Sequence, residues 1–185
     1  MKIENKVPIS LTFATSCFNE EGNIERFYIR CTNVIKQIQQ IWLNKIDFKF
    51  RIVISENCST DNTLSIVRKI AKEDTRVILL ENYKNYGSEN SMMSSVEYAK
   101  ESDLVFIICS DLQDPPEMVI EMLDKLLDQS EDIDSVIAVK KKSSGSIPGQ
   151  VAKKLFYRLL GKASRISRIP DGYNGIGCYR KEVIK

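Results

Sequence analysis

Short apolar runs alternate with longer amphipathic segments along most of the chain. Five runs have the length of β-strands and are mostly rich in β-branched and aromatic residues; they cover residues 9–15, 48–54, 77–80, 104–109 and 135–139. Between these runs, apolar residues recur at helical spacing, over residues 24–42, 64–71, 89–100 and 115–129. This order predicts one α/β domain with a mostly parallel sheet and helices on both of its faces.

The pattern is less regular after residue 139. Residues 140–149 are rich in Lys, Ser and Gly, as in a loop, and their three lysines either form a solvated face or meet phosphates. Residues 151–163 carry apolar positions at helical spacing, which predicts a basic amphipathic helix. Residues 173–185 contain two glycines and end in what we interpret as the start of another helix.

Composition restricts the chemistry more than the fold. The 185 residues are 43% hydrophobic and 28% charged, which is ordinary for one soluble globular domain. The net charge of +2 is no argument for nucleic-acid binding. The chain has no histidine, so a general base must be Asp, Glu or another group, and a metal must be held by oxygen or thiolate ligands.

The cysteines and the N-terminus indicate the compartment. Five cysteines, an odd number with no C-x-x-C pair, indicate a reducing, cytoplasmic setting. The N-terminus lacks the apolar core of a signal peptide, and no segment is long enough to span a bilayer.

Three predicted strands end in polar turns, at residues 16–21, 55–61 and 109–114. In a parallel sheet these turns emerge at one edge, where open α/β sheets bind ligands. The turns bring acidic and amide groups together, namely Glu20, Glu21, Glu56, Asn57, Asp111 and Gln113. Carboxylates gathered there repel each other unless a cation or hydrogen-bond donors lie among them. We therefore expect a site for a divalent cation and a ligand with donor groups, and a nucleotide carrying a diphosphate fits.

The turn after the fourth predicted strand is the most informative. Asp114 is predicted to cap the following helix, with Pro115 at its first position and Glu117 completing a capping box. Asp111 is either a solvated loop residue or a carboxylate that holds a cation against a phosphate, and we favour the second interpretation.

Other nucleotide and phosphate chemistries fit less well. The glycine pattern G-x-G-x-x-G and the P-loop are both absent, which argues against nicotinamide binding and P-loop hydrolysis. A response regulator with Asp111 as phosphate acceptor explains neither the position of the first polar turn nor the length of the chain.

Four strings, in order along the chain, carry a family resemblance. They are Cys17–Ile24 (CFNEEGNI), Glu56–Thr63 (ENCSTDNT), Lys84–Gly87 (KNYG) and Ser110–Glu117 (SDLQDPPE). The chain resembles family 2 glycosyltransferases, and most of all the dolichol-phosphate mannosyltransferase-like and polyprenyl-phosphate glycosyltransferase branch. The string FYRLL at residues 156–160 also resembles this branch.

The resemblance implies a GT-A fold, a nucleotide-diphosphate-sugar donor, and Mg²⁺ or Mn²⁺ bridging the diphosphate. It implies that Asp111 is the retained aspartate of a D-x-D metal motif, with Gln113 beside it, and that Glu56 or Asn57 meets the base. Asp171, the acid nearest to the loosely matched acceptor-side segment 174–181, is implied as catalytic together with Asp111. The implied nucleotide-sugar site comprises Ser16, Phe18, Glu20, Ser55, Glu56, Asn57, Ser110 and Asp111.

The implied reaction is a single, inverting displacement at the anomeric carbon, in which the metal stabilises the charge of the departing nucleotide. The acceptor is a polyprenyl phosphate or a saccharide; the first is favoured, and being anionic it needs no general base. The resemblance implies one catalytic domain over residues 1–185, with residues 140–185 on the acceptor side. We expect a role in cell-envelope or polysaccharide synthesis at the inner face of the cytoplasmic membrane.

The sequence also departs from the family pattern. Cys109 replaces the first D-x-D aspartate, Glu56-Asn57 replaces an Asp-Asp pair, and Ser16 replaces a proline. Enzymes of this branch that use lipid phosphates usually continue into membrane helices, so the chain is interpreted as a truncated piece, a natural short form or a soluble relative. The replaced acids motivate an alternative hypothesis, a non-catalytic nucleotide-sugar-binding module with a degenerate metal site.

Overall fold

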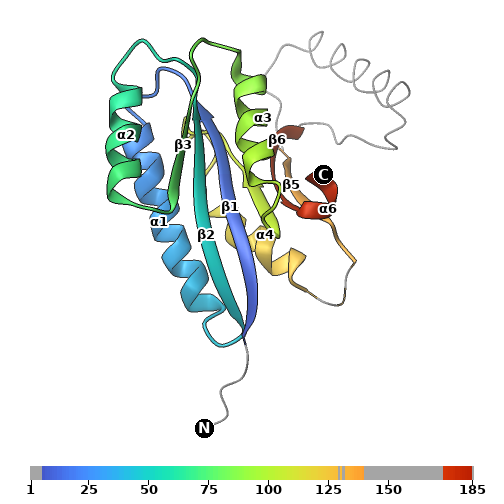
Figure 1. Ribbon diagram of the computed structural model, residues 1–185. Helices are drawn as coiled ribbons and strands as arrows, with labels where there is room; N and C mark the ends of the chain where they lie inside the picture. The colour runs from blue at the N-terminus through green and yellow to red at the C-terminus, as the bar shows by residue number, and fades with distance from the viewer. Residues whose placement is uncertain (1–5, 129, 131, 140–172, 185) are drawn as a thin grey trace, which may run out of the picture. The chain divides into compact units, whose positions relative to one another are not determined.

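The computed structural model describes residues 6–128, 130, 132–139 and 173–184, so the predicted loop at 140–149 and helix at 151–163 lie outside the described residues. Six strands form one sheet in the order β3-β2-β1-β4-β6-β5 (Figure 1). The strands are β1 (Val7–Cys17), β2 (Ile46–Glu56), β3 (Val77–Glu81), β4 (Leu104–Ile107), β5 (Ser135–Val139) and β6 (Tyr173–Arg180). The helices are α1 (Ile24–Ile41), α2 (Thr63–Glu73), α3 (Ser88–Ala99), α4 (Met118–Leu126) and the short α6 (Lys181–Ile184).

The chain divides into two compact units. The first contains residues 1–136 and 177–185, and the second contains residues 137–176. Of the second unit, the structure describes only residues 137–139 and 173–176, which belong to β5 and β6. The fold and the site described below belong to the first unit.

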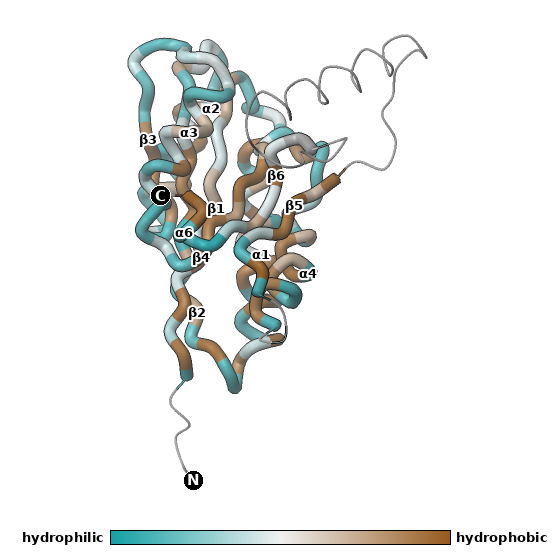
Figure 2. Tube along the Cα trace, turned by 90° about the vertical axis from the view of Figure 1, so that its right-hand side faces the viewer, coloured by the Kyte–Doolittle hydropathy of each residue, from teal (hydrophilic) through white to brown (hydrophobic). Residues whose placement is uncertain are grey.

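Strand pairing brings the predicted polar turns to one edge of the sheet. β1 pairs in parallel with β2 from Val7↔Ile46 to Cys17↔Glu56, and with β4 from Leu11↔Leu104 to Ala14↔Ile107. β3 continues the parallel arrangement on the outer side of β2. The carboxyl ends of these four strands therefore emerge together, and the loops at this edge are hydrophilic (Figure 2).

Both faces of the sheet are covered, as predicted. Consecutive residues of a strand point to opposite faces, and both Phe13 and Ala14 are fully buried. Ala14 packs with Val96 and Ala99 of α3, whereas the ring of Phe13 packs edge-on against Phe106 at a centroid distance of 5.4 Å. The buried residues of α1 recur at helical spacing, namely Ile24, Phe27, Cys31, Val34, Ile35 and Ile38.

The predicted capping box at α4 is wrong. The helix begins at Met118 rather than Pro115, and no side-chain hydrogen bond caps it. Pro116 disfavours helical backbone at Pro115, and the N–H of Met118 bonds to the Pro115 carbonyl in a tighter turn (3.2 Å). The carboxylate of Glu117 instead binds Arg30 of α1, a residue whose helix position alone predicts a solvated side chain.

Strand β6 is not predicted by the sequence pattern, which indicates only a segment with two glycines before the start of a helix. β6 runs antiparallel to β4, from Leu104↔Arg180 to Ile107↔Gly177. A Cβ at position 177 would come within 2.9 Å of the Tyr179 hydroxyl and of the Val136 carbonyl oxygen, so only glycine fits there. None of the helices in the described part of the chain is long and apolar enough to cross a membrane.

Candidate functional site

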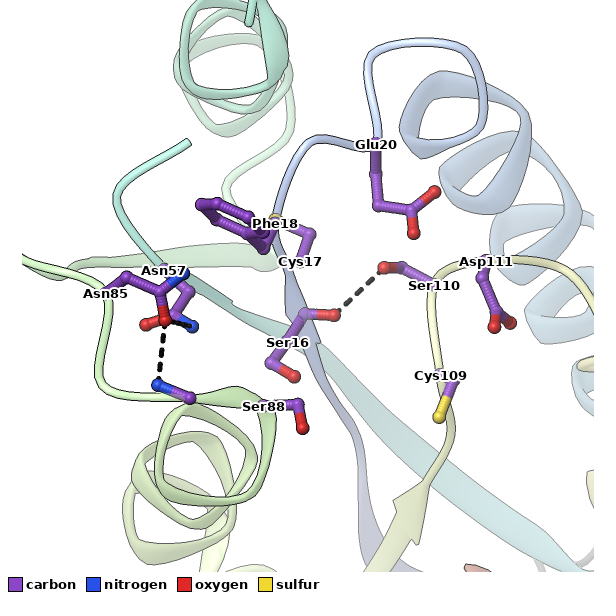
Figure 3. A pocket seen from close by; sticks show the side chains of 11 residues that line it. Ser16, Cys17, Phe18, Glu20, Asn57, Asn85, Ser88, Cys109, Ser110 and Asp111 are labelled. Atoms are coloured by element: carbon purple, nitrogen blue, oxygen red, sulfur yellow. Dashed lines mark hydrogen bonds between the residues drawn. The ribbon is translucent and has the colours of Figure 1, made fainter. Parts of the chain in front are cut away.

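A pocket of about 390 Å³ opens at the carboxyl ends of β1, β2 and β4, where the sequence predicts a site (Figure 3). Its walls come from the end of β1, from the turns after β1, β2 and β4, and from the loop between β3 and α3 together with the first residue of α3. The lining residues are Ser16, Cys17, Phe18, Glu20, Asn57, Asn85, Gly87, Ser88, Cys109, Ser110 and Asp111.

One side of the pocket is acidic. In Figure 3, Glu20 and Asp111 stand on the opposite side from Asn57 and Asn85. The N–H of Gln113 donates to the Oδ1 of Asp111 (3.1 Å), closing a tight turn in which Leu112 has a φ of 61°. A second hydrogen bond links the turn after β4 to the end of β1, in which the Ser110 hydroxyl donates to the Ser16 carbonyl oxygen (2.9 Å).

This acidic side suits a cation that arrives with a diphosphate. The structure contains no cluster of three or more His, Cys, Asp or Glu side chains around a common point in its described residues. Mg²⁺ is usually held by one or two carboxylates together with substrate phosphates and water, rather than by an all-protein cage. Asp111 therefore fits such a cation, and Cys109 lines the pocket with a thiol where a second carboxylate would be expected from the family motif.

The opposite side of the pocket is neutral and rich in amides. Asn57 is only 2% exposed, and its Nδ2 donates to the Oδ1 of Asn85 (2.9 Å). The backbone N–H of Tyr86 donates to the Oδ1 of Asn57 (2.9 Å). The ring of Phe18, 41% exposed, also borders the pocket and offers an apolar face.

Reciprocal hydrogen bonds clasp the turn after β1 to the turn after β2. The Asn19 N–H donates to the Ser59 hydroxyl (3.0 Å), and the Thr60 N–H donates to the Asn19 side chain (2.8 Å). The Glu21 N–H donates to Asp61, another of these links. Although burial alone raises the pKa of Asp61, hydrogen bonds, chiefly from Thr63, hold it below the usual value.

Six of the predicted nucleotide-sugar residues line the pocket: Ser16, Phe18, Glu20, Asn57, Ser110 and Asp111. Ser55 and Glu56 lie beneath it. The Ser55 hydroxyl is buried against Ser91 (2.9 Å), and the fully buried carboxylate of Glu56 accepts the N–H of Ser59 (2.8 Å). Gln113 is exposed beside Asp111 and is not among the lining residues, and Asp171 lies outside the described residues.

Five lining residues are not in the predicted nucleotide-sugar set: Cys109, Cys17, Asn85, Gly87 and Ser88. The last three follow β3, so the rule that places the other strand ends at this edge also applies to them. The sequence pattern predicts Cys17 in the turn after the first strand, whereas in the structure it is the last residue of β1. Its burial, with the nearby Glu56 and Glu20 carboxylates, raises the pKa of the Cys17 thiol far above its usual value, so the thiol stays protonated.

The sheet, its antiparallel strand β6 and the polar pocket at the strand ends define a GT-A fold, and solved structures agree. Glucosyl-3-phosphoglycerate synthase from Mycobacterium tuberculosis, crystallised with Mn²⁺, UDP and phosphoglyceric acid, aligns with a TM-score of 0.60 at 19% identity. The alignment covers 95% of this chain and 57% of that one. The mannosyltransferase PcManGT from Pyrobaculum calidifontis, in complex with GDP-Man and Mn²⁺, aligns with a TM-score of 0.57 at 19% identity, over 97% and 46% of the two chains.

The chain belongs to glycosyl transferase family 2, whose model matches residues 12–185. It is 29% identical to the bactoprenol glucosyl transferase of Shigella phage SfV, over 100% of this chain and 54% of that protein. It is 28% identical to an undecaprenyl-phosphate 4-deoxy-4-formamido-L-arabinose transferase of Shewanella sediminis, over 74% and 40%. The chain spans about half the length of the curated relatives it matches.

Proposed function

We propose that this glycosyltransferase moves a sugar from a nucleotide-diphosphate-sugar, bound in the strand-end pocket, to a polyprenyl phosphate. The observation that carries the proposal is the polarity of the pocket, which has carboxylates on one side and amides on the other. A nucleotide-sugar matches this polarity if the base meets Asn57 and Asn85 and the diphosphate meets Asp111. Phe18 then packs against the nucleoside.

Asp111 and Gln113 are proposed to hold Mg²⁺ or Mn²⁺ at the diphosphate. When bound, such a cation neutralises the charge that develops on the departing nucleoside diphosphate. Asp111 supplies an oxygen ligand already oriented by the Gln113 N–H, and the bond from Ser110 to Ser16 keeps this turn next to the end of β1. Glu20 faces the same space and disfavours a diphosphate that enters without its cation.

The absence of histidine favours an acceptor that is already a nucleophile. A polyprenyl phosphate is anionic at neutral pH, so its oxygen attacks the anomeric carbon without a general base while the bond to the diphosphate breaks. A single displacement of this kind inverts the anomeric configuration. A saccharide acceptor needs a base to take its hydroxyl proton, and Asp171 is the candidate. Action at the inner face of the cytoplasmic membrane follows from the lipid acceptor and remains a prediction.

Calorimetric titration tests the donor site. UDP, GDP, CDP and dTDP are each added with and without Mn²⁺, to the wild type, to Asp111→Asn and to Asp47→Asn. Asp47 is an exposed carboxylate at the amino end of β2, so its variant makes the same change of charge at the other edge of the sheet. We expect one nucleotide to bind with Mn²⁺, with at least tenfold loss in Asp111→Asn and no change in Asp47→Asn.

Other results redirect the proposal. Tight binding that ignores both Mn²⁺ and Asp111 would replace it with a metal-independent site. Binding of the nucleotide with no transfer to undecaprenyl phosphate, in a chain extended to the length of its relatives, would favour the non-catalytic module that Cys109 motivates. Failure of all four nucleotides to bind would contradict the donor site itself.

A further inference from the structure

The side chain of Asn57 holds the loop between β3 and α3 against the pocket. Its Oδ1 accepts the N–H of Tyr86 (2.9 Å) and the side-chain amide of Asn82 (3.3 Å). Its Nδ2 donates to the Oδ1 of Asn85 (2.9 Å), which also accepts the N–H of Gly87 (2.8 Å). One buried amide thus joins the end of β2 to three residues of this loop.

Two backbone N–H groups determine the orientation of the side-chain amides of Asn57 and Asn85. The N–H groups of Tyr86 and Gly87 can only donate, so the atoms that they meet must be the oxygens of Asn57 and Asn85. Each of these oxygens accepts two hydrogen bonds, which uses both of its lone pairs. The Nδ2 of Asn85 has no hydrogen-bond partner among the residues that the structure describes. The amide wall therefore offers a ligand donors and no free side-chain acceptor at these two residues.

We propose that Asn57 is the positioning residue that makes this wall a donor surface, and that Asn85 reads the base through its exocyclic carbonyl oxygen. The inference rests on the proposed function, because it takes the base to lie at this wall. Uracil, thymine, cytosine and guanine carry such an oxygen, whereas adenine carries an amino group in its place. The donor is accordingly a nucleoside diphosphate with a carbonyl-bearing base, and ADP binds at least tenfold more weakly.

An isosteric change separates positioning from simple contact. Asn57→Asp keeps the size of the side chain and the acceptor for Tyr86, but it cannot donate to Asn85. The carboxylate then faces the oxygen of Asn85, which must turn over, lose the Gly87 N–H and present oxygen to the base. In the wild type, Asn85→Ala removes the contact between Asn85 and the base directly. In the Asn57→Asp variant that contact is already lost, so Asn85→Ala should have little further effect on binding.

The experiment is a double-mutant cycle on the affinity for the tightest of the four nucleotides, with Mn²⁺. We expect Asn57→Asp and Asn85→Ala each to weaken binding about tenfold, and the double variant to bind no more than twofold more weakly than Asn57→Asp. Asn44→Asp makes the same chemical change at an exposed site between α1 and β2, and it should leave the affinity unchanged. The free energy of unfolding is also measured in urea for the wild type, the two single variants and the double variant. If Asn57 holds the loop, the effects of the two substitutions on this free energy are coupled as well.

The outcomes separate this inference from the proposed function. Equal losses from Asn85→Ala in both backgrounds would overturn the positioning role of Asn57 while the nucleotide site stands. If ADP binds with the same affinity as the tightest of the other nucleotides, Asn85 does not recognise the base by its exocyclic carbonyl oxygen. If the wild type binds none of the nucleotides, the proposed function and the base-reading role both fail, and the coupling in unfolding free energy decides whether Asn57 holds the loop.

Discussion

Arg30→Ala should loosen the turn that carries Asp111. Arg30 projects from α1 and binds the carboxylate of Glu117 with two parallel hydrogen bonds, of 3.0 and 2.5 Å. The hydrogen bond from Arg30 holds the pKa of Glu117 below its usual value, so the pair stays ionised at neutral pH. Glu117 lies at the start of α4, directly after the Asp111 turn, and the pair therefore fixes one end of that turn against α1.

The exposure of the pair limits its energy. The side chains of Arg30 and Glu117 are 36% and 41% exposed, and exposed ion pairs contribute roughly 0.2–1 kcal/mol because water and salt screen them. The two-pronged geometry argues for the upper end, about 1 kcal/mol. We expect that loss in the free energy of unfolding and, because the turn loses one anchor, up to about fivefold weaker Mn²⁺-dependent nucleotide binding.

A matched pair on the same chain provides the control. Arg68 binds Glu81 with the same two-pronged geometry, at 2.8 and 2.6 Å, and neither residue lines the pocket. Arg68→Ala should cost a similar unfolding free energy and leave nucleotide affinity unchanged. Charge reversal, Arg30→Glu with Glu117→Arg, should recover part of the affinity that either single reversal loses. If Arg30→Ala weakens binding no more than Arg68→Ala, the pair does not support the turn.

Two further predictions concern the half-buried carboxylate of Asp74 and the reactivity of the thiols. Hydrogen bonds from Arg76, and then from Tyr28, lower the pKa of Asp74 from 3.8 to about 2. The stabilisation from the Asp74 carboxylate is therefore complete above about pH 4 and is lost as the pH falls through about 2. Asp74→Asn should lower the free energy of unfolding, measured in urea, by about 2 kcal/mol at pH 7 and by less at pH 3. An equal loss at both pH values would contradict this prediction. A thiol reagent should modify Cys58 and Cys109 before the three buried cysteines, and bound nucleotide should slow the labelling of Cys109, as followed by mass spectrometry; modification of buried Cys31 ahead of Cys109 would contradict the exposure of the pocket thiol.

Local pattern is sufficient for most of the elements and for the location of the site. The spacing of Ile24, Phe27 and Cys31 predicts the buried face of α1, because helical periodicity alone brings these side chains together. The position of the pocket follows from strand direction, since parallel strands must end at one edge. The motif strings identified the family, which the match over residues 12–185 confirms.

Which side chains enter the pocket depended on contacts between segments far apart in the chain. Glu56 and Asn57 are neighbours in one motif, yet only Asn57 reaches a distant segment, the loop after β3, while the buried Glu56 carboxylate accepts the N–H groups of Cys58 and Ser59 in its own turn. The position of Arg30 in its helix predicts a solvated side chain. It binds Glu117 because the turn before α4 passes beside α1.

The buried face of α3 is not predicted by the sequence, because Ser91 and Ser95 are buried there while Met93 is 60% exposed. The sequence does predict the order of the first strands and helices, the buried faces of α1 and α2 and the edge that carries the chemistry. These follow from side-chain periodicity and strand direction, which are properties of each segment. The tertiary structure alone decided that residues 173–180 pair with β4 as an antiparallel strand, that Glu56 is buried under the site, and that the amides of Asn57 and Asn85 face as they do. β6 and Asn57 meet partners from distant segments, which no local pattern encodes. The carboxylate of Glu56, in contrast, accepts the N–H groups of Cys58 and Ser59 within its own turn.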